Sequence, residues 1–207
     1  MIILFIALAY LIGSIPTAVW IGKRFYGIDV REFGSGNAGA TNTFRVLGRK
    51  AGIPVLLIDI FKGALAVILS RFAGLEIGSD EFINLQLGLG VAAILGHIFP
   101  VFAGFRGGKG VATILGIVIC ILPVATSISL LIFLVVLFSS RIVSLSSMLA
   151  GISFPIILNI VLNNTNPILT TFSIIVALML LVTHRKNIVR LLSKKENKIQ
   201  LFGTSKK

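Results

Sequence analysis

The segment GVATILGIVICILPVATSISLLIFLVVLFSS, residues 110–140, contains no charged side chain. It is too long for one ordinary membrane span, which needs roughly 20 apolar residues, and too short for two full ones. Pro123 lies near its middle, where a proline interrupts helical hydrogen bonding. The segment therefore predicts two short helices that meet at a tight turn, with a single kinked helix as the alternative.

The rest of the chain has the same apolar character. Of its 207 residues, 56% are hydrophobic and 13% are charged, whereas soluble domains are roughly 45–50% apolar and about a quarter charged. No stretch is long and polar enough to form a soluble domain. The sequence therefore predicts an all-α integral membrane protein with a single transmembrane domain over residues 1–207.

Hydrophobic runs predict seven transmembrane helices. We expect the first to be retained, because it lacks a basic leader region and contains Pro16. Seven spans place Arg141 on the same side as the other basic loops, whereas five spans would place it opposite them. The predicted spans are Ile2–Gly22, Gly52–Ala73, Leu85–Ala103, Gly110–Leu122, Val124–Ser140, Leu145–Leu162 and Ile168–His184.

The net charge of +12 supports an orientation for these spans. Basic residues gather between spans one and two, between spans three and four, and in the tail from about residue 185. Glu76, Asp80 and Glu81 fall on the opposite side. Because positively charged loops stay in the cytoplasm, we expect the N-terminus outside and the C-terminus in the cytoplasm. The same rule explains the basic residues without a nucleic-acid partner.

Three polar clusters interrupt the apolar sequence, and all three fall on the predicted cytoplasmic side. They are GSGNAGATN (34–42), FRGGKG (105–110) and THRKN (183–187). Glycines let successive N–H groups turn toward one point and form an anion nest. In the first cluster, a helix that starts near Ala38–Ala40 would add a favourable field for phosphate, with Arg45 close by. A flexible loop before a capped helix is the alternative.

The second cluster is not a Walker A loop, because Gly110 rather than Ser or Thr follows Lys109, and no strand precedes it. It still predicts a backbone nest at the start of the fourth span with a lysine charge beside it, and a loop with positive-inside residues is the alternative. In the third cluster His184 and Asn187 are three residues apart and would share a helix face. Histidine is the side chain most easily used as an acid or base near neutral pH, although an interfacial polar cap is the alternative.

Three further polar residues fall inside predicted spans. We expect His97 to be a hydrogen-bonded packing residue rather than a ligand. Asp59 and Lys62 lie at i,i+3, so we expect an internal ion pair that lowers the cost of burying either charge, rather than the wall of a site. With two histidines and one cysteine in the chain, no metal site is expected.

Three linked motifs resemble those of the bacterial acyl-phosphate:glycerol-3-phosphate acyltransferases, the PlsY family. They are GSGNxGATNxxR (34–45), HxFPVFxxFxGGKGVAT (97–113) and THRxNIxRL (183–191). They occur in the family's order, and the resemblance covers nearly the whole chain. The family usually has a glycine two residues before its final motif glutamate, here Glu196. This chain has Lys194 instead, which leaves the conformation of the tail open.

The resemblance implies the first acylation step of bacterial phospholipid synthesis. A fatty acyl group would pass from acyl phosphate to the 1-hydroxyl of glycerol 3-phosphate, giving 1-acylglycerol 3-phosphate (lysophosphatidate) and phosphate. The family uses neither acyl-CoA nor acyl carrier protein as direct donor, and no cofactor is implied. The enzyme would lie in the lipid bilayer of the cytoplasmic membrane as a multi-pass protein with a cytoplasmic active site. The oligomeric state is open, with a monomer favoured, and so is the acyl-chain preference.

The resemblance also implies the site residues. The catalytic residues would be Ser35, His184 and Asn187. Lys109 and Arg45 would hold phosphate oxygens by charge-assisted hydrogen bonds. The substrate-binding residues would be Gly36, Asn37, Arg45, Gly107, Gly108, Lys109, Gly110 and Ser144, with no metal.

Two mechanisms and two other functions remain open. The hydroxyl attacks directly and loses its proton to His184 or to a donor phosphate oxygen, or Ser35 takes the acyl group first. Direct attack is favoured, because acyl phosphate is already activated.

A transporter for an organic phosphate would have polar residues near the midplane and repeated halves, neither of which is evident here. A small membrane scaffold would leave the three clusters unexplained.

Overall fold

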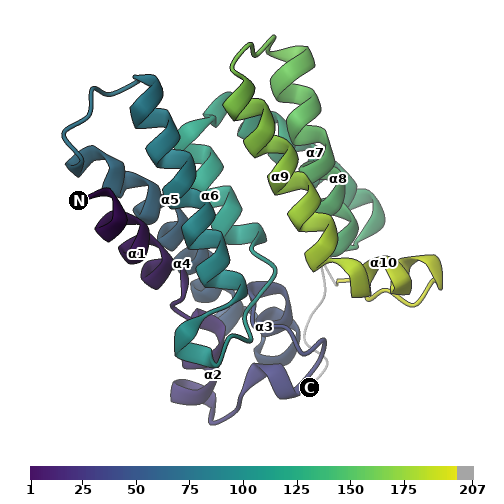
Figure 1. Ribbon diagram of the computed structural model, residues 1–207. Helices are drawn as coiled ribbons and strands as arrows, with labels where there is room; N and C mark the ends of the chain where they lie inside the picture. Colours follow the sequence, from purple (N-terminus) through teal and green to yellow (C-terminus); the bar gives the residue numbers. More distant parts are fainter. Residues whose placement is uncertain (200–207) are drawn as a thin grey trace. The chain divides into compact units, whose positions relative to one another are not determined.

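The computed structural model describes residues 1–199, and every regular element among them is a helix (Figure 1). The chain divides into two compact units, Met1–Pro123 and Val124–Lys207. The prediction of an all-α protein is confirmed for the described residues. The prediction of a single domain over residues 1–207 stays a prediction.

The first unit consists of α-helices joined by short 3₁₀ turns. Its elements are α1 (Ile2–Gly13), α2 (Thr17–Tyr26), η1 (Val30–Glu32), α3 (Ala40–Leu47), α4 (Arg49–Ile68), η2 (Leu69–Phe72), α5 (Asp80–Ile98), η3 (Val101–Ala103) and α6 (Val111–Ile121). The Ser79 side chain caps α5 by accepting the Phe82 N–H, and acidic residues occupy the first turn. Both features stabilise a helix N-terminus.

Small residues let the long helices of this unit approach closely. A Cβ on Gly63 of α4 would overlap the Thr113 carbonyl of α6, and one on Gly116 of α6 would overlap the Ile60 carbonyl of α4. Gly13 of α1 packs equally closely against α5. Helices in membranes associate through such small residues, because backbone packing replaces the hydrophobic effect between them. The helix ends that carry the polar clusters therefore rest on a tightly packed frame.

The first predicted span, Ile2–Gly22, is in fact a bent pair of helices, because α1 and α2 meet at an angle of 41°. Pro16 follows the break and has no N–H to continue a helix. The Lys62 ammonium donates to the Ile15 carbonyl at 2.8 Å and pairs with the Asp59 carboxylate at 2.8 Å. The expected internal ion pair is confirmed, and it also satisfies a carbonyl that the break exposes.

The second unit contains α7 (Pro123–Ser140), α8 (Val143–Ile156), the π-helical segment η4 (Ile157–Val161), α9 (Pro167–Thr183) and α10 (Arg185–Leu192). Asn166 caps α9, since its side chain accepts the N–H groups of Ile168 and Leu169. Pro167 at the start of the helix suits a position whose N–H would have no helical partner. Helices α8 and α9 pack where Gly151 lies against Leu180.

The two-helix interpretation of residues 110–140 is confirmed. Helix α6 ends at Ile121, and Leu122 leaves the helical region with φ −134° and ψ 62°. Helix α7 then starts at Pro123. The proline acts here as a first helical residue, where its fixed φ suits the new helix, and not as a kink inside one long helix.

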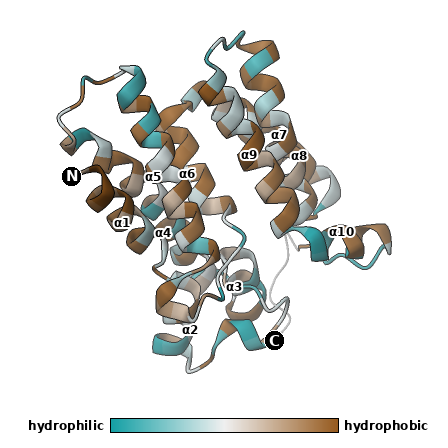
Figure 2. Ribbon diagram, viewed as in Figure 1, coloured by the Kyte–Doolittle hydropathy of each residue, from teal (hydrophilic) through white to brown (hydrophobic). Residues whose placement is uncertain are grey.

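Within residues 1–199, four segments are long and apolar enough to cross a membrane: Arg49–Phe72, Asp80–Ala103, Pro123–Ser140 and Val143–Val161. The number rises to six if α1 with α2, and α9 with α10, each form one span. Helix α6 is apolar but has 11 residues, about 16 Å against a hydrocarbon core of about 30 Å. Figure 2 shows the apolar length of α1 and the hydrophilic start of α10. The membrane class is supported, while seven spans and their orientation stay predictions.

Candidate active site

Asn42, in the first turn of α3, organises the first polar cluster. It is 1% exposed, and its side-chain amide donates to the carbonyls of Val30 at 2.8 Å and Phe33 at 3.1 Å. Its Oδ1 accepts both the backbone N–H of Ser35 at 2.8 Å and the Ser35 hydroxyl at 3.1 Å. A buried amide with every group paired fixes the loop around it. The Ser35 hydroxyl is therefore held in place by Asn42.

The anion nest predicted for the first cluster is only partly present. The N–H of Ser35 is paired with Asn42, and the N–H of Gly36 donates to the Phe33 carbonyl at 3.1 Å, so neither points toward an anion. Helix α3 does begin at Ala40, as expected. The N–H groups of Ala40 and Thr41 have no hydrogen-bond partner among the described residues. The start of α3 therefore supplies the favourable field for an anion.

Gly34 and Arg45 flank this region. Gly34 has φ 62°, and a Cβ there would overlap the Asn42 side chain, so only glycine fits. Asn37 is partly buried, and Arg45 is exposed on α3 beside Gly34. The exposed guanidinium of Arg45 therefore places a positive charge on α3, the helix whose N-terminus favours an anion.

The second cluster is docked against the end of α5. The N–H of Gly107 donates to the Ile98 carbonyl, and the N–H of Gly108 donates to the His97 carbonyl, each at 3.1 Å. Helix-end carbonyls therefore already bind these two N–H groups, and the anion nest expected at the start of the following helix stays a prediction. The two glycines serve close packing instead, since a Cβ on Gly107 would overlap the His97 carbonyl.

The first two clusters meet inside the first unit. A Cβ on Gly108 would lie 3.0 Å from the Ala38 carbonyl oxygen and would overlap the His97 ring. Gly110 has φ 86° and starts α6, with the partly buried Lys109 just before it. The structure thus brings a lysine-bearing glycine segment against the start of α3, although the two lie more than 60 residues apart in the sequence.

A buried polar network lies behind this contact. The His97 Nδ1 is 3.1 Å from the Thr113 hydroxyl of α6 and 3.9 Å from the Asp59 carboxylate of α4. The Thr17 hydroxyl donates to the same carboxylate at 3.0 Å. The expectation that His97 is a hydrogen-bonded packing residue agrees with these contacts. The network links helices α2, α4, α5 and α6 beneath the Gly107–Gly108 segment.

In the second unit, Glu196 gathers three donors. Its Oε1 accepts the Ser144 hydroxyl at 2.9 Å and the Asn187 amide at 2.6 Å, and its Oε2 accepts Nε of Arg190 at 2.7 Å. Burial alone would raise the pKa of Glu196, but hydrogen bonds from Arg190, Asn187 and Ser144 outweigh it and hold the pKa below its usual value. Two predicted site residues, Ser144 and Asn187, are thus joined by one ionised carboxylate.

His184 lies between α9 and α10, which are bent by 61°, so His184 and Asn187 do not share one continuous helix as predicted. They are still close, since the Asn187 N–H donates to the His184 carbonyl at 2.7 Å. The ring Nδ1 is 2.8 Å from the Leu180 carbonyl. A carbonyl only accepts, so Nδ1 carries the proton and Nε2 of the neutral ring is the basic nitrogen.

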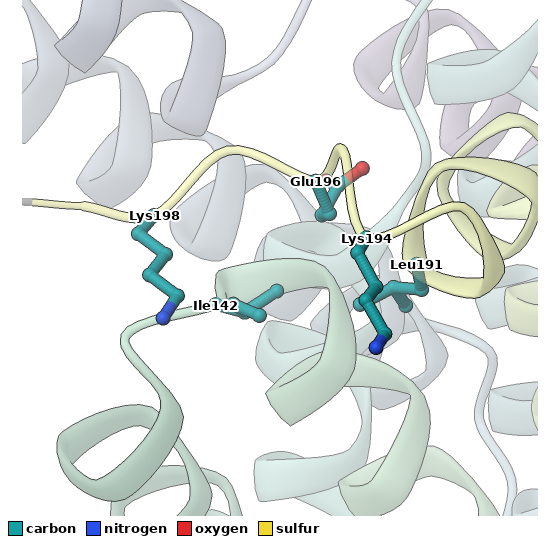
Figure 3. A pocket seen from close by; sticks show the side chains of 5 residues that line it. All are labelled: Ile142, Leu191, Lys194, Glu196 and Lys198. Carbon is teal, nitrogen blue, oxygen red and sulfur yellow. The ribbon is translucent and has the colours of Figure 1, made fainter.

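The tail folds back beside this carboxylate. Lys194, where the family usually has glycine, has φ 56°, a left-handed conformation that glycine adopts without strain. A hollow of about 330 Å³ is lined by Ile142, Leu191, Lys194, Glu196 and Lys198. Figure 3 shows these side chains around it. The unusual backbone at Lys194 is the local bend that returns Glu196 toward α8 and α10.

The predicted site residues therefore form two groups. Ser35, Gly36, Asn37, Arg45, Gly107, Gly108, Lys109 and Gly110 lie in the first unit, and Ser144, His184 and Asn187 lie in the second. Three residues outside the predicted site prove central to the geometry: Asn42, Arg31 and Glu196. Asn42 and Glu196 stand inside or beside the recognised motifs. For Asn42 and Glu196, a polar side chain in or next to a motif was the feature of the sequence that could have identified them.

The chain was compared with known proteins. Residues 3–194 match the family described as glycerol-3-phosphate acyltransferase. A glycerol-3-phosphate acyltransferase of Chlorobium phaeobacteroides is 47% identical over 99% of both chains, and one of Enterococcus faecalis is 43% identical over 100% of this chain and 95% of its own. Crystal structures of PlsY, an integral membrane glycerol 3-phosphate acyltransferase, match with TM-scores of 0.84 and 0.82. The glycerol 3-phosphate form is 35% identical to this chain and covers 96% of both chains. The lysophosphatidic acid form is 34% identical and covers 96% of this chain and 95% of its own.

Proposed function

We propose that this chain, which belongs to the glycerol-3-phosphate acyltransferase family, transfers a fatty acyl group from acyl phosphate to the 1-hydroxyl of glycerol 3-phosphate. The observation that carries the proposal is the similarity over 96% of the chain to a protein solved with glycerol 3-phosphate and with lysophosphatidic acid. These are the acceptor and the acylated product of the proposed reaction. Phosphate is the other product.

The proposed topology has seven spans, with the N-terminus outside and the C-terminus in the cytoplasm of a bacterial cell. Both groups of site residues would then face the cytoplasm, and the chain would form a single domain. A long acyl chain would enter from the inner leaflet. The exposed apolar side chains along the helices, among them Leu131, Val135 and Phe138 of α7, support lipid contact.

The first unit would bind the phosphate groups. Among the described residues, the first N–H groups of α3 have no hydrogen-bond partner, and the exposed Arg45 lies on the same helix. Lys109 follows the two glycines that rest on α5 and precedes α6. Cations and a helix N-terminus both favour an anion, and charge-assisted hydrogen bonds are roughly twice as strong as neutral ones.

The second unit would supply proton transfer and orientation. The 1-hydroxyl oxygen attacks the acyl carbonyl carbon, the bond from that carbon to the phosphate oxygen breaks, and phosphate leaves. The hydroxyl proton passes to Nε2 of His184 or to a phosphate oxygen of the donor. Asn187, held by Glu196, would help to stabilise the developing oxyanion, while the Ser144 hydroxyl donates to Glu196 and keeps that carboxylate in place. Acyl phosphate is already activated, so we favour direct attack over an acyl-Ser35 intermediate.

The decisive experiment measures phosphate release by the detergent-purified protein. Acyl phosphate with glycerol 3-phosphate should release phosphate and form lysophosphatidate, whereas acyl-CoA should not replace the donor. Release without glycerol 3-phosphate would indicate a hydrolase, and no release at all would leave an organic-phosphate transporter as the better assignment. Arg45→Ala and Lys109→Ala should lose most activity while still inserting in membranes. Lys50→Ala, at an exposed position of α4, is the control and should retain it.

The topology has its own test. Single cysteines are placed at exposed positions in a Cys120→Ser background and labelled in intact cells with an impermeant thiol reagent. Arg45→Cys, Arg106→Cys and Lys186→Cys should be protected, and Glu76→Cys and Thr165→Cys should react. Labelling of any one of the first three from outside would divide the proposed site between the two sides of the membrane.

A further inference from the structure

Arg31 makes a forked contact with Asp29 two residues before it. Nε of Arg31 donates to Oδ1 of Asp29 at 3.0 Å, and Nη2 donates to Oδ2 at 2.7 Å. The backbone N–H of Arg31 also donates to Oδ1 at 3.0 Å, so Asp29 caps the short helix η1. This fork fixes the plane of the guanidinium, and the flexible ammonium of a lysine does not reproduce it.

The remaining edge of the guanidinium reaches a distant segment. Nη1 of Arg31 donates to the carbonyl oxygens of Ala103 at 2.8 Å and Arg106 at 3.3 Å. These carbonyls bracket the turn that leads into Gly107, Gly108 and Lys109. One side chain therefore joins the segment before the first polar cluster to the turn at which the second begins, at the end of the first unit where α2, α3 and the α5–α6 connection lie (Figure 1).

The burial of Arg31 and its ion pair with Asp29 distinguish it from an arginine that binds an anion. The Arg31 side chain is 15% exposed and that of Asp29 is 9% exposed. The hydrogen bond from Arg31 holds the pKa of Asp29 far below its usual value, against the opposing effect of burial. The carboxylate thus stays ionised and neutralises the guanidinium throughout the physiological range. Arg45, by contrast, is exposed.

We propose that Arg31 is a positioning residue that clamps the two glycine-rich clusters at a fixed separation, so that Lys109 and the start of α3 address the same phosphorylated substrate. The clamp rests on the proposed function for its kinetic consequence. Its structural consequence, the ordering of residues 103–110, does not depend on that function.

The test compares Arg31→Lys, Arg31→Ala and the wild-type enzyme. Arg31→Lys keeps the positive charge and loses the fork, so it distinguishes geometry from electrostatic attraction. Both variants should raise KM for glycerol 3-phosphate by about tenfold, the order expected for losing hydrogen bonds to a charged group, with a much smaller change in kcat. Arg24→Ala is the matched control, because Arg24 lies on the neighbouring helix and stacks near Phe25; its KM should be unchanged.

Hydrogen exchange supplies a readout that does not require catalysis. Amides of residues 103–110 should exchange faster in Arg31→Lys than in the wild type, and at the wild-type rate in Arg24→Ala. Wild-type KM and wild-type exchange in Arg31→Lys would overturn the clamp, and so would a lower kcat with unchanged KM. If the wild-type protein shows no acyl transfer, the proposed function fails, and the exchange measurement still decides the clamp.

Discussion

The carboxylate of Glu196 accepts the side-chain amide of Asn187 at 2.6 Å. The same carboxylate binds Ser144 and Arg190, so one acidic group orients two proposed site residues that lie 43 positions apart in the sequence. Its side chain is 6% exposed, which makes each of these contacts stronger than it would be in water. The proposed catalytic geometry of the second unit therefore depends on a residue outside the predicted set of site residues.

Replacing Glu196 by Gln should reduce kcat by about tenfold or more, because the neutral amide no longer accepts from all three donors. Binding of glycerol 3-phosphate should change less, since the phosphate-binding residues are proposed to lie in the first unit. Steady-state kinetics on purified protein measure both quantities. Glu76→Gln removes an exposed acid from a loop and should leave kcat unchanged. A fall in kcat of equal size in both variants would argue against orientation by Glu196.

The wild type and Glu196→Gln should also differ in how their stability depends on pH. The pKa of Glu196 is lowered in the folded protein, so its stabilising contribution is complete above its unfolded pKa of about 4.3. It is lost as the pH falls through the lower folded value. The difference in melting temperature between wild type and Glu196→Gln should therefore be constant from pH 8 to about 5 and shrink below about pH 4. A difference that grows on acidification would contradict this sign.

Asn42→Ala should disorder the first cluster. The change removes the side-chain donor from the carbonyls of Val30 and Phe33, which keep only their backbone donors, and releases Ser35. Buried groups that lose a partner cost about 1–3 kcal/mol each, so we expect the free energy of unfolding to fall by about 2 kcal/mol or more. Chemical denaturation in detergent measures it. Thr41→Ala, at the preceding and less buried position, should be far milder, and equal losses would show that Asn42 has no special role.

Sequence patterns predicted the helices well, and the packing of the glycine-rich segments less well. The break at Pro123 and the Asp59–Lys62 pair follow from local rules on proline and i,i+3 spacing, so they were predictable. The pairing of the Gly107 and Gly108 N–H groups with the end of α5 was not. That pairing depends on how the chain returns after η3, which no local pattern encodes. A pair of glycines also suits an anion nest and a close packing contact equally well.

Gly108→Ala tests whether the close packing of this glycine between the two clusters is needed. Its Cβ would meet the His97 ring and the Ala38 carbonyl, so the substitution should push the two clusters apart and raise KM for glycerol 3-phosphate by about tenfold, while kcat changes less. Gly88→Ala is the matched control, because a Cβ at this exposed position of α5 meets nothing within 4 Å. It should leave KM unchanged and raise stability by about 0.5–1 kcal/mol. Wild-type KM in Gly108→Ala would show that the contact between clusters is not needed.

Lys194 shows how a departure from a family pattern is accommodated. The position has φ 56°, and a residue with a Cβ costs about 1–2 kcal/mol there relative to glycine. Lys194→Gly should remove that strain and, after the added flexibility of the unfolded chain is subtracted, raise stability by about 0.5–1 kcal/mol. For a chain of this size that is about 1–3 °C in melting temperature. Lys195→Gly removes the same charge at a position without positive φ and should not stabilise. If both variants raised the melting temperature equally, loss of charge repulsion among the tail lysines would be the cause, and the backbone at Lys194 would carry no strain.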